Sequence, residues 1–566
     1  MSKCVKALGL VVVLVICTSV CAVMVSADSI FEGNKTLSSN LIYVPDNYTT
    51  IQQAVNLAIA GDTIIVRDGR YLENVDVYQT LTIQSENGSE NCIVEAANPN
   101  DHVFEVTVDY VNISGFTVTE ATEDEKSGIY LSGVAHCNIS NNNASNNIVG
   151  IYLYSSSNNS LMGNTASNNE FCIFLDSSSN NRFIDNSFSN NGLIVVSSYH
   201  NIVANNTVNA KPLVYLEDVA DEMITAAGQV ILVNCDNITV NNLDVSHASV
   251  GIELWNTNNS KIVNNTVSNN ACGIFLSWSN KNNLTGNTAN SNIYDGICLL
   301  SSSNKNNLTG NTANSNNACG ISLGSSNNNT LTSNTANSNR YFGIHLSSSS
   351  SNHIYNNYFN NTNNAWDDGN NIWNISKTYG TNIIGGSWLG GNYWSDYAGE
   401  DTSGDGLGDT SVPYNSSGGI QNGGDRLPLV KAVEPIFDTN EGTYPSISGT
   451  FTGTITPSRN LTVSTLYTYY CKGTGGHTKS IELYDDTTPI ASGVWSGYAG
   501  DWHNVTFNEV TLLKDHEYRY IIETGSYPQI IHQSPYNATG GKITCEEFVD
   551  INGIVHYDWI PAIRLS

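Results

Sequence analysis

The sequence predicts an all-β protein: a right-handed, single-stranded parallel β-helix followed by an antiparallel β-sandwich. Two apolar markers return about every 22 to 24 residues between Asn-, Ser- and Gly-rich segments, and such a period is typical of a solenoid. The first marker is a Gly-Ile pair that begins at Gly128, Gly150, Gly251, Gly273, Gly296, Gly320 and Gly343. The second marker is a single Ile or Leu at Ile139, Leu161, Ile184, Ile202, Ile238, Ile262, Leu284, Leu308, Leu331 and Ile354.

Each repeat unit reads as one coil of stacked short strands. Ile129 and Leu131 are two positions apart and therefore share one face of a strand, while the flanking Asn and Ser residues tolerate turns. Leucine-rich repeats have a similar period but need more leucines in each unit. A disordered low-complexity tract would explain the Asn and Ser residues without requiring Ile and Leu in phase. The persistent phase favours the solenoid.

Residues 1–27 are predicted to be a secretory signal peptide, with 28–41 as a linker. Lys3 and Lys6 precede an apolar run that ends in the small residues Val25, Ser26 and Ala27, a pattern typical of cleavage by signal peptidase. No later segment approaches about 18 consecutive apolar residues, so we expect no transmembrane segment in the mature chain. Asn-X-Ser/Thr sequons recur through the chain, which suits a glycosylated exterior protein.

The charge balance narrows the range of partners. Asp and Glu number 51 against 22 Lys and Arg, which gives a formal net charge of -29. This is the wrong sign for binding a nucleic-acid backbone, so nucleic acid is not expected as a partner. Such a surface attracts divalent cations, although solubility alone explains it equally well.

The predicted β-helix covers residues 42–365, with an N-terminal cap. Residues 50–59 show an amphipathic pattern, with Ile51, Val55 and Ile59 on one face of a short helix. The coil at residues 208–230 is longer than the others and acidic, and it reads either as an elaborated coil or as an insertion that carries a binding loop. Cysteines within the coils are expected to be buried as small residues rather than bridged.

Two further segments follow the predicted coils. Residues 366–435 are rich in Trp, Gly and Asp and are expected to close the open end of the solenoid. Residues 436–566 are rich in Thr, Tyr and Val with alternating stretches, which predicts a β-sandwich domain. Its two cysteines, Cys471 and Cys545, are expected to form a disulfide in an exported protein.

Three segments together resemble a known family. The stretch TIQQAVNLAIAGDTIIVRDGRYLENVDV, the Gly-Ile-x-Leu coils and the closing GGNYWSDYAGEDTSGDGLGDTSVPY resemble the NosD-type right-handed parallel β-helix proteins, with carbohydrate-binding and sugar-hydrolase-like repeats among their relatives. The C-terminal part is similar to a module that accompanies such β-helices in secreted surface proteins of methanogenic archaea. The resemblance implies an extracellular or cell-envelope protein and implies no reaction.

The sharpest local motif predicts a structural calcium site. Oxygen-bearing residues alternate along the segment 401–409, and a glycine permits the tight turn, as in loops that hold a hard cation. The twelfth position is Val412 rather than an acid, so another residue such as Asp425 would have to complete the shell. A Gly-Asp turn without metal is the alternative. The expected ligands are Asp401, Ser403, Asp405, the Leu407 carbonyl and Asp409.

No catalytic constellation is predicted. A lyase or hydrolase on this scaffold needs acids and a base that converge on one face, but the acids and arginines of the coils are scattered among separate units. Asp367 and Asp368 lie next to each other beside Trp366, where a structural turn is the preferred interpretation over catalysis. The histidines of the coils lack metal-ligand spacing and are expected at the surface or in corners.

Sugar binding without catalysis is better supported. Aromatic rings can stack on sugar rings, and stacked Asn and Ser corners offer ordered donors and acceptors. Core packing is the alternative for at least half of these aromatic side chains. The sequence therefore predicts a non-catalytic surface protein that binds a polysaccharide or an envelope glycoprotein, with a polysaccharide-active enzyme as the alternative. The expected sugar-binding residues are Trp495, Tyr498, Trp502 and His503.

Overall fold

The computed structural model describes residues 40–401, 405–431, 437–471, 478–496, 503–525 and 527–566. These residues fall into two compact units, divided after Lys431, and each unit is considered by itself. The predicted signal peptide and most of the predicted linker lie outside the described residues. Strands dominate both units, and the helices among the described residues are α2 (Ile51–Leu57) and the 3-10 turn η2 (Ser416–Gly418).

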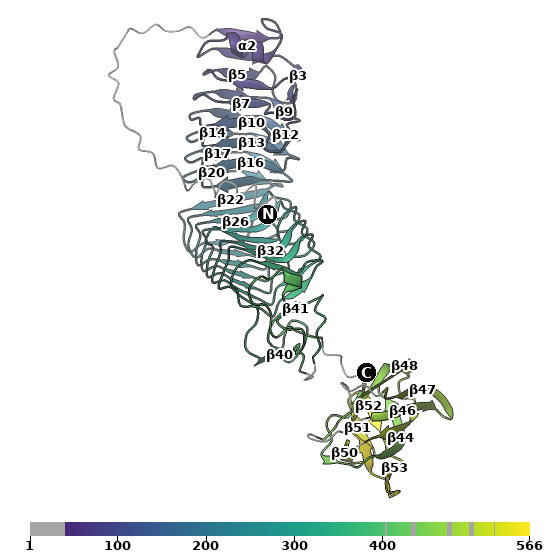
Figure 1. The fold of residues 1–566 in the computed structure, drawn as a ribbon. Helices are drawn as coiled ribbons and strands as arrows, with labels where there is room; N and C mark the ends of the chain where they lie inside the picture. The colour runs from purple at the N-terminus through teal and green to yellow at the C-terminus, as the bar shows by residue number, and fades with distance from the viewer. Residues whose placement is uncertain (1–39, 402–404, 432–436, 472–477, 497–502, 526) are drawn as a thin grey trace. The chain divides into compact units, whose positions relative to one another are not determined.

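The first unit begins with a stack of parallel coils that has three faces, which confirms the predicted parallel β-helix (Figure 1). Each strand pairs with the equivalent strand one coil away, so that Ile113, Ile139 and Leu161 lie in one row. The first face contains β1 (Leu41–Val44), β2 (Thr63–Val66), β5 (Thr82–Ser85), β8 (Asn112–Ser114), β11 (Asn138–Ser140), β14 (Ser160–Met162), β17 (Arg182–Ile184) and β20 (Ile202–Ala204). The second contains β3 (Gly69–Leu72), β6 (Cys92–Glu95), β9 (Thr117–Thr119), β12 (Asn143–Ser145), β15 (Thr165–Ser167), β18 (Ser187–Ser189) and β21 (Thr207–Val208). The third contains β4 (Val75–Val77), β7 (Phe104–Val106), β10 (Ser127–Ser132), β13 (Val149–Tyr154), β16 (Phe171–Asp176) and β19 (Leu193–Val196).

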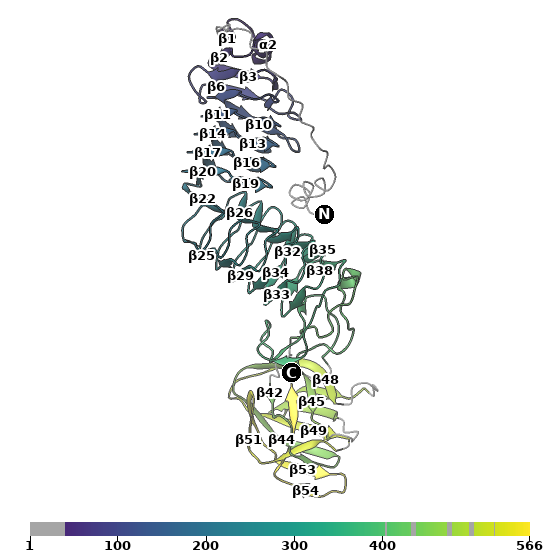
Figure 2. The ribbon, with the colours of Figure 1, turned by 90° about the vertical axis from the view of Figure 1, so that its left-hand side faces the viewer.

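The chain reverses direction after β21. Val208 of β21 pairs antiparallel with Lys211 of β22 (Lys211–Glu217), and the two residues between them, Asn209 and Ala210, have φ angles of 51° and 61°. Two consecutive residues with positive φ are typical of a tight hairpin. The segment 208–230 is therefore neither an elaborated coil nor a projecting loop: its hairpin starts a second stack, and Figure 2 shows the change of direction between β20 and β22.

The second stack is again parallel, from β22 onward. On its third side, successive coils are paired through isolated β-bridges instead of longer strands, for example Asp244 with Thr266 and Thr266 with Thr288. One face contains β22, β24 (Gln229–Val233), β26 (Val250–Trp255), β28 (Cys272–Ser277), β30 (Ile297–Leu300), β32 (Cys319–Gly324), β35 (Phe342–Ser347) and β38 (Ala365–Asp367). Another contains β23 (Met223–Ile224), β25 (Thr239–Asn241), β27 (Lys261–Val263), β29 (Asn283–Thr285), β31 (Asn307–Thr309), β33 (Thr330–Thr332) and β36 (His353–Tyr355).

The side of the second stack closes the open end of the first. On β24, Val230 and Leu232 point into the second core, whereas Ile231 and Val233 belong to the core of the first stack. Trp255 of β26 joins the same first core and is only 1% exposed. One strand thus serves two cores, because neighbouring residues of a strand point to opposite faces.

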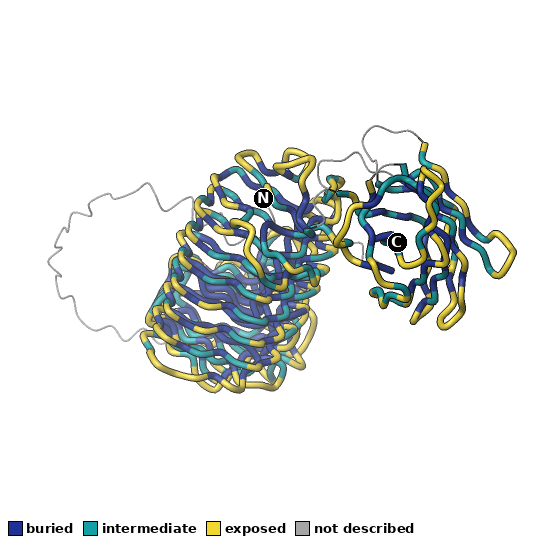
Figure 3. Tube along the Cα trace, turned by 90° about the horizontal axis from the view of Figure 1, so that it is seen from below, coloured by how far each residue is buried: buried dark blue, intermediate teal, exposed yellow. Residues whose placement is uncertain are grey.

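Buried asparagines connect successive coils. The Oδ1 atom of Asn311 accepts the main-chain N–H of Asn287 at 2.9 Å and the Asn287 side-chain amide at 2.9 Å. Its own Nδ2 donates to the carbonyl of Leu284 at 2.8 Å and to Oδ1 of Asn334 at 2.9 Å. The same arrangement repeats along the stack, so corner groups that the strand ladder leaves unpaired are satisfied without water. In Figure 3 the coils carry buried residues along their inner surface and exposed residues at their corners.

Both ends of the first unit are covered. At the start, α2 buries Ile51, Ala54 and Val55, and its first N–H groups donate to the carboxylate of Glu73. Ile59, expected on the same face, is 47% exposed because the helix ends at Leu57. At the other end, Trp and Tyr residues cover the last coils through β34 (Thr335–Asn337), β37 (Tyr358–Asn360), β41 (Tyr393–Trp394), β39 (Thr378–Tyr379) and β40 (Trp388–Leu389).

The second unit consists of antiparallel strands around one core, as the sequence predicts. Phe451, Tyr520 and Phe548 are fully buried in this core. One sheet contains β42 (Phe437–Asp438), β56 (Ile563–Leu565), β45 (Leu461–Thr468) and β48 (Asn504–Leu512), and a small one contains β43 (Tyr444–Pro445), β50 (Gln529–His532) and β55 (Trp559–Pro561). The largest contains β47 (Thr488–Val494), β46 (Thr478–Asp485), β49 (Tyr518–Thr524), β44 (Gly449–Pro457), β52 (Gly541–Ile543), β51 (Tyr536–Ala538), β53 (Glu547–Asp550) and β54 (Val555–His556).

We predict that Asn311→Ala destabilises the first unit by roughly 2–4 kcal/mol, because it leaves buried main-chain and side-chain groups of two coils without partners. Urea unfolding followed by circular dichroism measures the change. Asn283→Ala is the matched control, since Asn283 is exposed on β29, and it should alter stability by less than about 0.5 kcal/mol. Equal effects of the two substitutions would contradict the role given to the buried amides.

Candidate functional site

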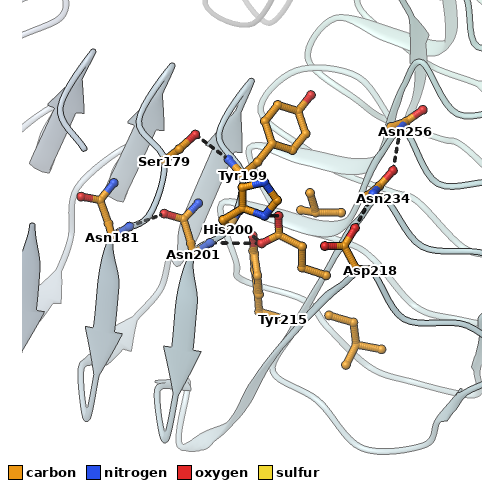
Figure 4. Close-up of polar contacts among 12 residues, drawn as sticks. Ser179, Asn181, Tyr199, His200, Asn201, Tyr215, Asp218, Asn234 and Asn256 are labelled. Carbon is orange, nitrogen blue, oxygen red and sulfur yellow. Dashed lines mark hydrogen bonds and ion pairs between the residues drawn. The ribbon is translucent and has the colours of Figure 1, made fainter. Parts of the chain in front are cut away.

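The reversal between the stacks brings together a histidine and two acids. His200 lies in the corner between β19 and β20, the last coil of the first stack, whereas Glu217 ends β22 and Asp218 follows it. One potential ligand atom from each residue lies within 4.8 Å of the others, and among the described residues this is the group of three or more His, Cys, Asp and Glu side chains with metal-site spacing. Figure 4 shows the cluster between the two stacks.

The carboxylate of Glu217 caps the last coil of the first stack. Its Oε1 accepts the main-chain N–H of His200 at 2.5 Å, and its Oε2 accepts that of Asn201 at 3.1 Å and the Tyr215 hydroxyl at 2.7 Å. One coil earlier the N–H of Asn181 donates to Oδ1 of Asn201 at 2.9 Å. Glu217 therefore replaces the amide that the next coil would have supplied (Figure 4).

Other side chains of the second stack cap the same open edge. The N–H of Gly192 donates to Oγ of Ser249 at 2.8 Å, that of Leu193 to Oε1 of Gln229 at 3.0 Å, and that of Val195 to Oε1 of Glu253 at 3.3 Å. Asp218 accepts a hydrogen bond from the side chain of Asn234, and His200 Nδ1 lies 3.7 Å from Glu217 Oε1. The cluster has metal-like spacing, but Glu217 makes the contacts of a structural cap, and Asp218 binds a side-chain amide of the second stack.

The sequence did not identify this cluster. It placed His200 at the surface or in a corner, and it noted the acidic residues of the segment 208–230. The hairpin at Asn209 and Ala210, which brings Glu217 and Asp218 close to His200, was not predicted. The sequence does contain one sign of the hairpin: Lys211-Pro212 interrupts the Asn-rich corner pattern shortly after β21.

Each strongly buried acid of the first unit has its own hydrogen-bond network. Asp367, at the end of β38, accepts hydrogen bonds from Gly369 N, Asn371 Nδ2 and Trp373 Nε1. Asp176 accepts from the Ser177 hydroxyl at 2.9 Å, and burial raises its pKa. In the part of the chain that the structure describes, these acids lie in separate coils and do not form a catalytic pair.

Glu253 and Asp425 are the acids most affected by burial. Burial raises the pKa of Glu253 to about 8 even though its Oε1 accepts from Trp255 Nε1 at 2.6 Å. The pKa of Asp425 is raised by burial to about 7, and its Oδ2 accepts from Asn392 N at 2.7 Å and Trp394 Nε1 at 2.8 Å. Asp425, suggested by the sequence as an addition to the calcium shell, is fully buried within the closing segment.

The predicted calcium loop is partly described. Ser403 lies outside the described residues. Asp401 accepts the N–H groups of Asp405 at 3.1 Å and Gly406 at 2.6 Å, and Asp405 accepts the N–H of Leu407 at 2.9 Å and forms an ion pair with Lys377. The amide of Asp409 donates to the Glu400 carbonyl at 2.8 Å. Carboxylates of this loop thus bind its own main chain, and a cation there would share them.

The predicted sugar-binding aromatics can be followed only in part. Tyr498 and Trp502 lie outside the described residues. Trp495 packs against the core of the second unit, and the His503 ring stacks on Tyr470 with centroids 4.0 Å apart. Trp495 and His503 therefore both have packing contacts, the alternative that the sequence left open.

The cysteines follow the predictions in the coils. Cys137, Cys172 and Cys235 are buried, and burial raises the pKa of the Cys137 thiol to about 11 and that of Cys172 to about 12. In the second unit Cys545 is a buried free thiol in this structure, whereas Cys471 is partly exposed. The Cys471–Cys545 disulfide stays a prediction.

Two stacks of short parallel strands, tied by buried asparagines and covered at their ends, define a parallel β-helix protein. Residues 34–221 and 216–399 match the family model described as "Periplasmic copper-binding protein (NosD)". The chain belongs to the NosD family. The two matched ranges overlap at residues 216–221, a few residues after the hairpin that separates the two stacks.

Similarity to individual proteins is more limited. A cell surface glycoprotein of Methanothermus fervidus is 35% identical over 104 residues, which are 18% of this chain and 16% of that protein. The chain thus matches only about a sixth of that relative's length. The Dettilon tailspike protein is 13% identical with a TM-score of 0.31, covering 86% of this chain and 94% of that one. An alginate lyase from Paenibacillus sp. str. FPU-7 is 14% identical with a TM-score of 0.26, covering 59% and 97%. Structural likeness this low carries no functional argument.

The family description raises the question of copper. Copper(I) prefers thiolate and thioether ligands, whereas the junction cluster offers one imidazole and two carboxylates. The buried coil thiols described above are held protonated by burial, and the metal-like cluster contains no cysteine. The junction cluster therefore does not fit a copper(I) site. The described helices are also too short to cross a membrane.

We predict that the first unit loses stability as the pH rises from about 5 to about 8. A carboxyl group whose folded pKa exceeds its unfolded value stabilises the fold when protonated, and this contribution disappears as pH rises through the folded pKa; the slope approaches about 1.4 kcal/mol per pH unit for each group. Glu253→Gln should make the unfolding free energy, measured by urea unfolding, depend less steeply on pH. The contribution of Asp425 to the pH dependence should remain. Glu222→Gln, at an exposed position, should keep the wild-type slope. An unchanged slope in Glu253→Gln would contradict this assignment.

Proposed function

We propose that this protein is a non-catalytic component of the cell surface that binds a polysaccharide or a neighbouring envelope glycoprotein. The observation that carries the proposal is the use of the buried acids: in the described coils Glu217, Glu253, Asp367 and Asp425 each accept main-chain or side-chain N–H groups at a stack edge or a turn. Acids used in this way cap coils. The name of the methanogen relative and the periplasmic family description support an extracellular location.

The outer corners of the coils supply the binding groups in this proposal. Residues such as Asn280 and Asn304 line the outside of a corner, and each corner repeats one coil further along. A regular polymer meets the same donors and acceptors at each coil, which gives many weak contacts along one chain. In the second unit, Trp495 and His503 are proposed to add ring stacking, together with Tyr498 and Trp502.

The loop at 401–409 is proposed to bind structural calcium. Its support is the row of oxygen-bearing residues, together with the hydrogen bonds that the Asp401 carboxylate accepts from the amides of Asp405 and Gly406. Calcium would compete with Lys377 for Asp405.

We predict that purified protein produces no new reducing ends and no unsaturated products from a panel of neutral and acidic polysaccharides. Binding to at least one of them should be detectable by affinity electrophoresis. A reaction that Asp176→Asn abolishes would overturn the non-catalytic proposal in favour of a polysaccharide-active enzyme. The protein should be assayed with calcium present, so that a negative result is not caused by the lack of a structural ion.

We predict that chelation lowers the Tm of the wild-type protein by a few degrees and that added calcium restores it, because a ligand of the folded state stabilises that state. Asp405→Asn should remove the response to chelator. Asp185→Asn, at an exposed corner of the first stack, should respond like the wild type. Identical chelator responses of wild type and Asp405→Asn would reject calcium at this loop.

A further inference from the structure

One segment of the second stack has more basic than acidic residues although the whole chain is acidic. Between residues 259 and 366 the sequence has Lys261, Lys281, Lys305 and Arg340 but a single acid, Asp295. Asp295 is fully buried, so it does not balance these cations at the surface. In a chain with a formal charge of -29, this segment is therefore locally basic. Lys281 and Lys305 precede β29 and β31 at one corner, whereas Arg340 precedes β35 at another.

Two of the lysines line a hollow in one corner of the stack. The hollow has a volume of about 430 Å³ and lies between the face of β26, β28 and β30 and the face of β27, β29 and β31. Lys281 and Lys305 lie in successive coils, because the N–H of Lys281 donates to the carbonyl of Asn304 at 3.1 Å. Their main chains are therefore only about 4.8 Å apart. The hollow is lined by Asp236, Asn258, Asn259, Asn280, Lys281, Asn304 and Lys305.

Lysine is an unusual residue at these two positions. Lys281 and Lys305 have φ angles of 59° and 58°, a left-handed conformation that favours asparagine and glycine. The equivalent corner of other coils in the second stack has Asn237, Asn259, Asn328 or Ser351, each also with positive φ. Neighbouring ammonium groups also repel one another. Backbone conformation and charge both disfavour this pair, which indicates that it serves a ligand.

The other lining groups suit a sugar. Oδ1 of Asn280 accepts the N–H of Asn304 at 2.9 Å, which holds the amide row in place along the corner. The one acid, Asp236, accepts the side-chain amide of Asn259 at 2.6 Å, so it already has a partner. Fixed amides bind hydroxyl groups, and exposed ammonium groups bind carboxylates.

We propose that this corner hollow binds a carboxylate-bearing polysaccharide, with Lys281 and Lys305 contacting uronate groups of one chain. The proposal rests on the proposed glycan-binding function and names its ligand class. Nucleic acid is the less favoured polyanion because the rest of the surface is acidic. Because the contacts are ionic and exposed, binding weakens as salt increases.

The test uses the full chain, produced without N-glycosylation because sequons at Asn283 and Asn307 lie two residues beyond the lysines. Isothermal titration measures binding of oligogalacturonate, with a neutral galactan, sulfated dextran and a DNA duplex as comparison ligands. Lys281→Gln/Lys305→Gln should weaken oligogalacturonate binding at least about tenfold at low salt. Lys281→Arg/Lys305→Arg should largely retain binding, and Asn328→Lys, which adds a lysine at the next corner, should strengthen it.

Lys514→Gln/Lys542→Gln makes the same change of net charge in the second unit and should bind like the wild type. Equal oligogalacturonate affinity of wild type and Lys281→Gln/Lys305→Gln would overturn the assignment, as would tighter binding of DNA or sulfated dextran than of oligogalacturonate. If the neutral galactan alone binds, the uronate assignment fails while the glycan-binding function stands. If no glycan binds, both fail.

Discussion

The hydrogen bond from a main-chain N–H to the side-chain amide of the next coil is the interaction on which this architecture depends. In a coil of three-residue strands, many main-chain N–H and C=O groups lie in the corners and form no strand-to-strand hydrogen bond. If these groups were buried without partners, the loss of folding free energy would exceed the gain from such short strands. Asn287, Asn311 and Asn334 satisfy these groups in a continuous row. The same rule creates a problem at each end, because the last coil has no following amide.

Carboxylates solve that problem in both stacks. The row Asn181, Asn201 ends on Glu217, and the row Asn357, Asn392 ends on Asp425. A carboxylate accepts several N–H groups at once and needs no further coil to receive a donor of its own. This explains why Asp425, whose pKa is raised by burial as that of a catalytic acid can be, lies here at the end of a stack.

The sequence predicted the coils well because their period is set by local chemistry: one inward Ile or Leu for each strand and one corner asparagine. It chose the wrong inward residue in strands where two adjacent residues are both apolar. The markers Ile184 and Ile202 are not the inward residues of their strands: Phe183 pairs with Leu161, Val203 pairs with Phe183, and Ile202 is 49% exposed. The hairpin at Asn209 was invisible for a related reason, since asparagine with positive φ is also the ordinary corner residue.

Function in such a protein is carried by positions that the coil does not constrain. Inward residues are constrained by packing and buried amides by the hydrogen-bond rows, whereas neither constrains an exposed corner residue. The left-handed corner position is the most informative of these, because the backbone there prefers asparagine. When Lys281 and Lys305 occupy it in successive coils, neither packing nor conformation explains the choice, and the remaining explanation is contact with an anion that spans both coils.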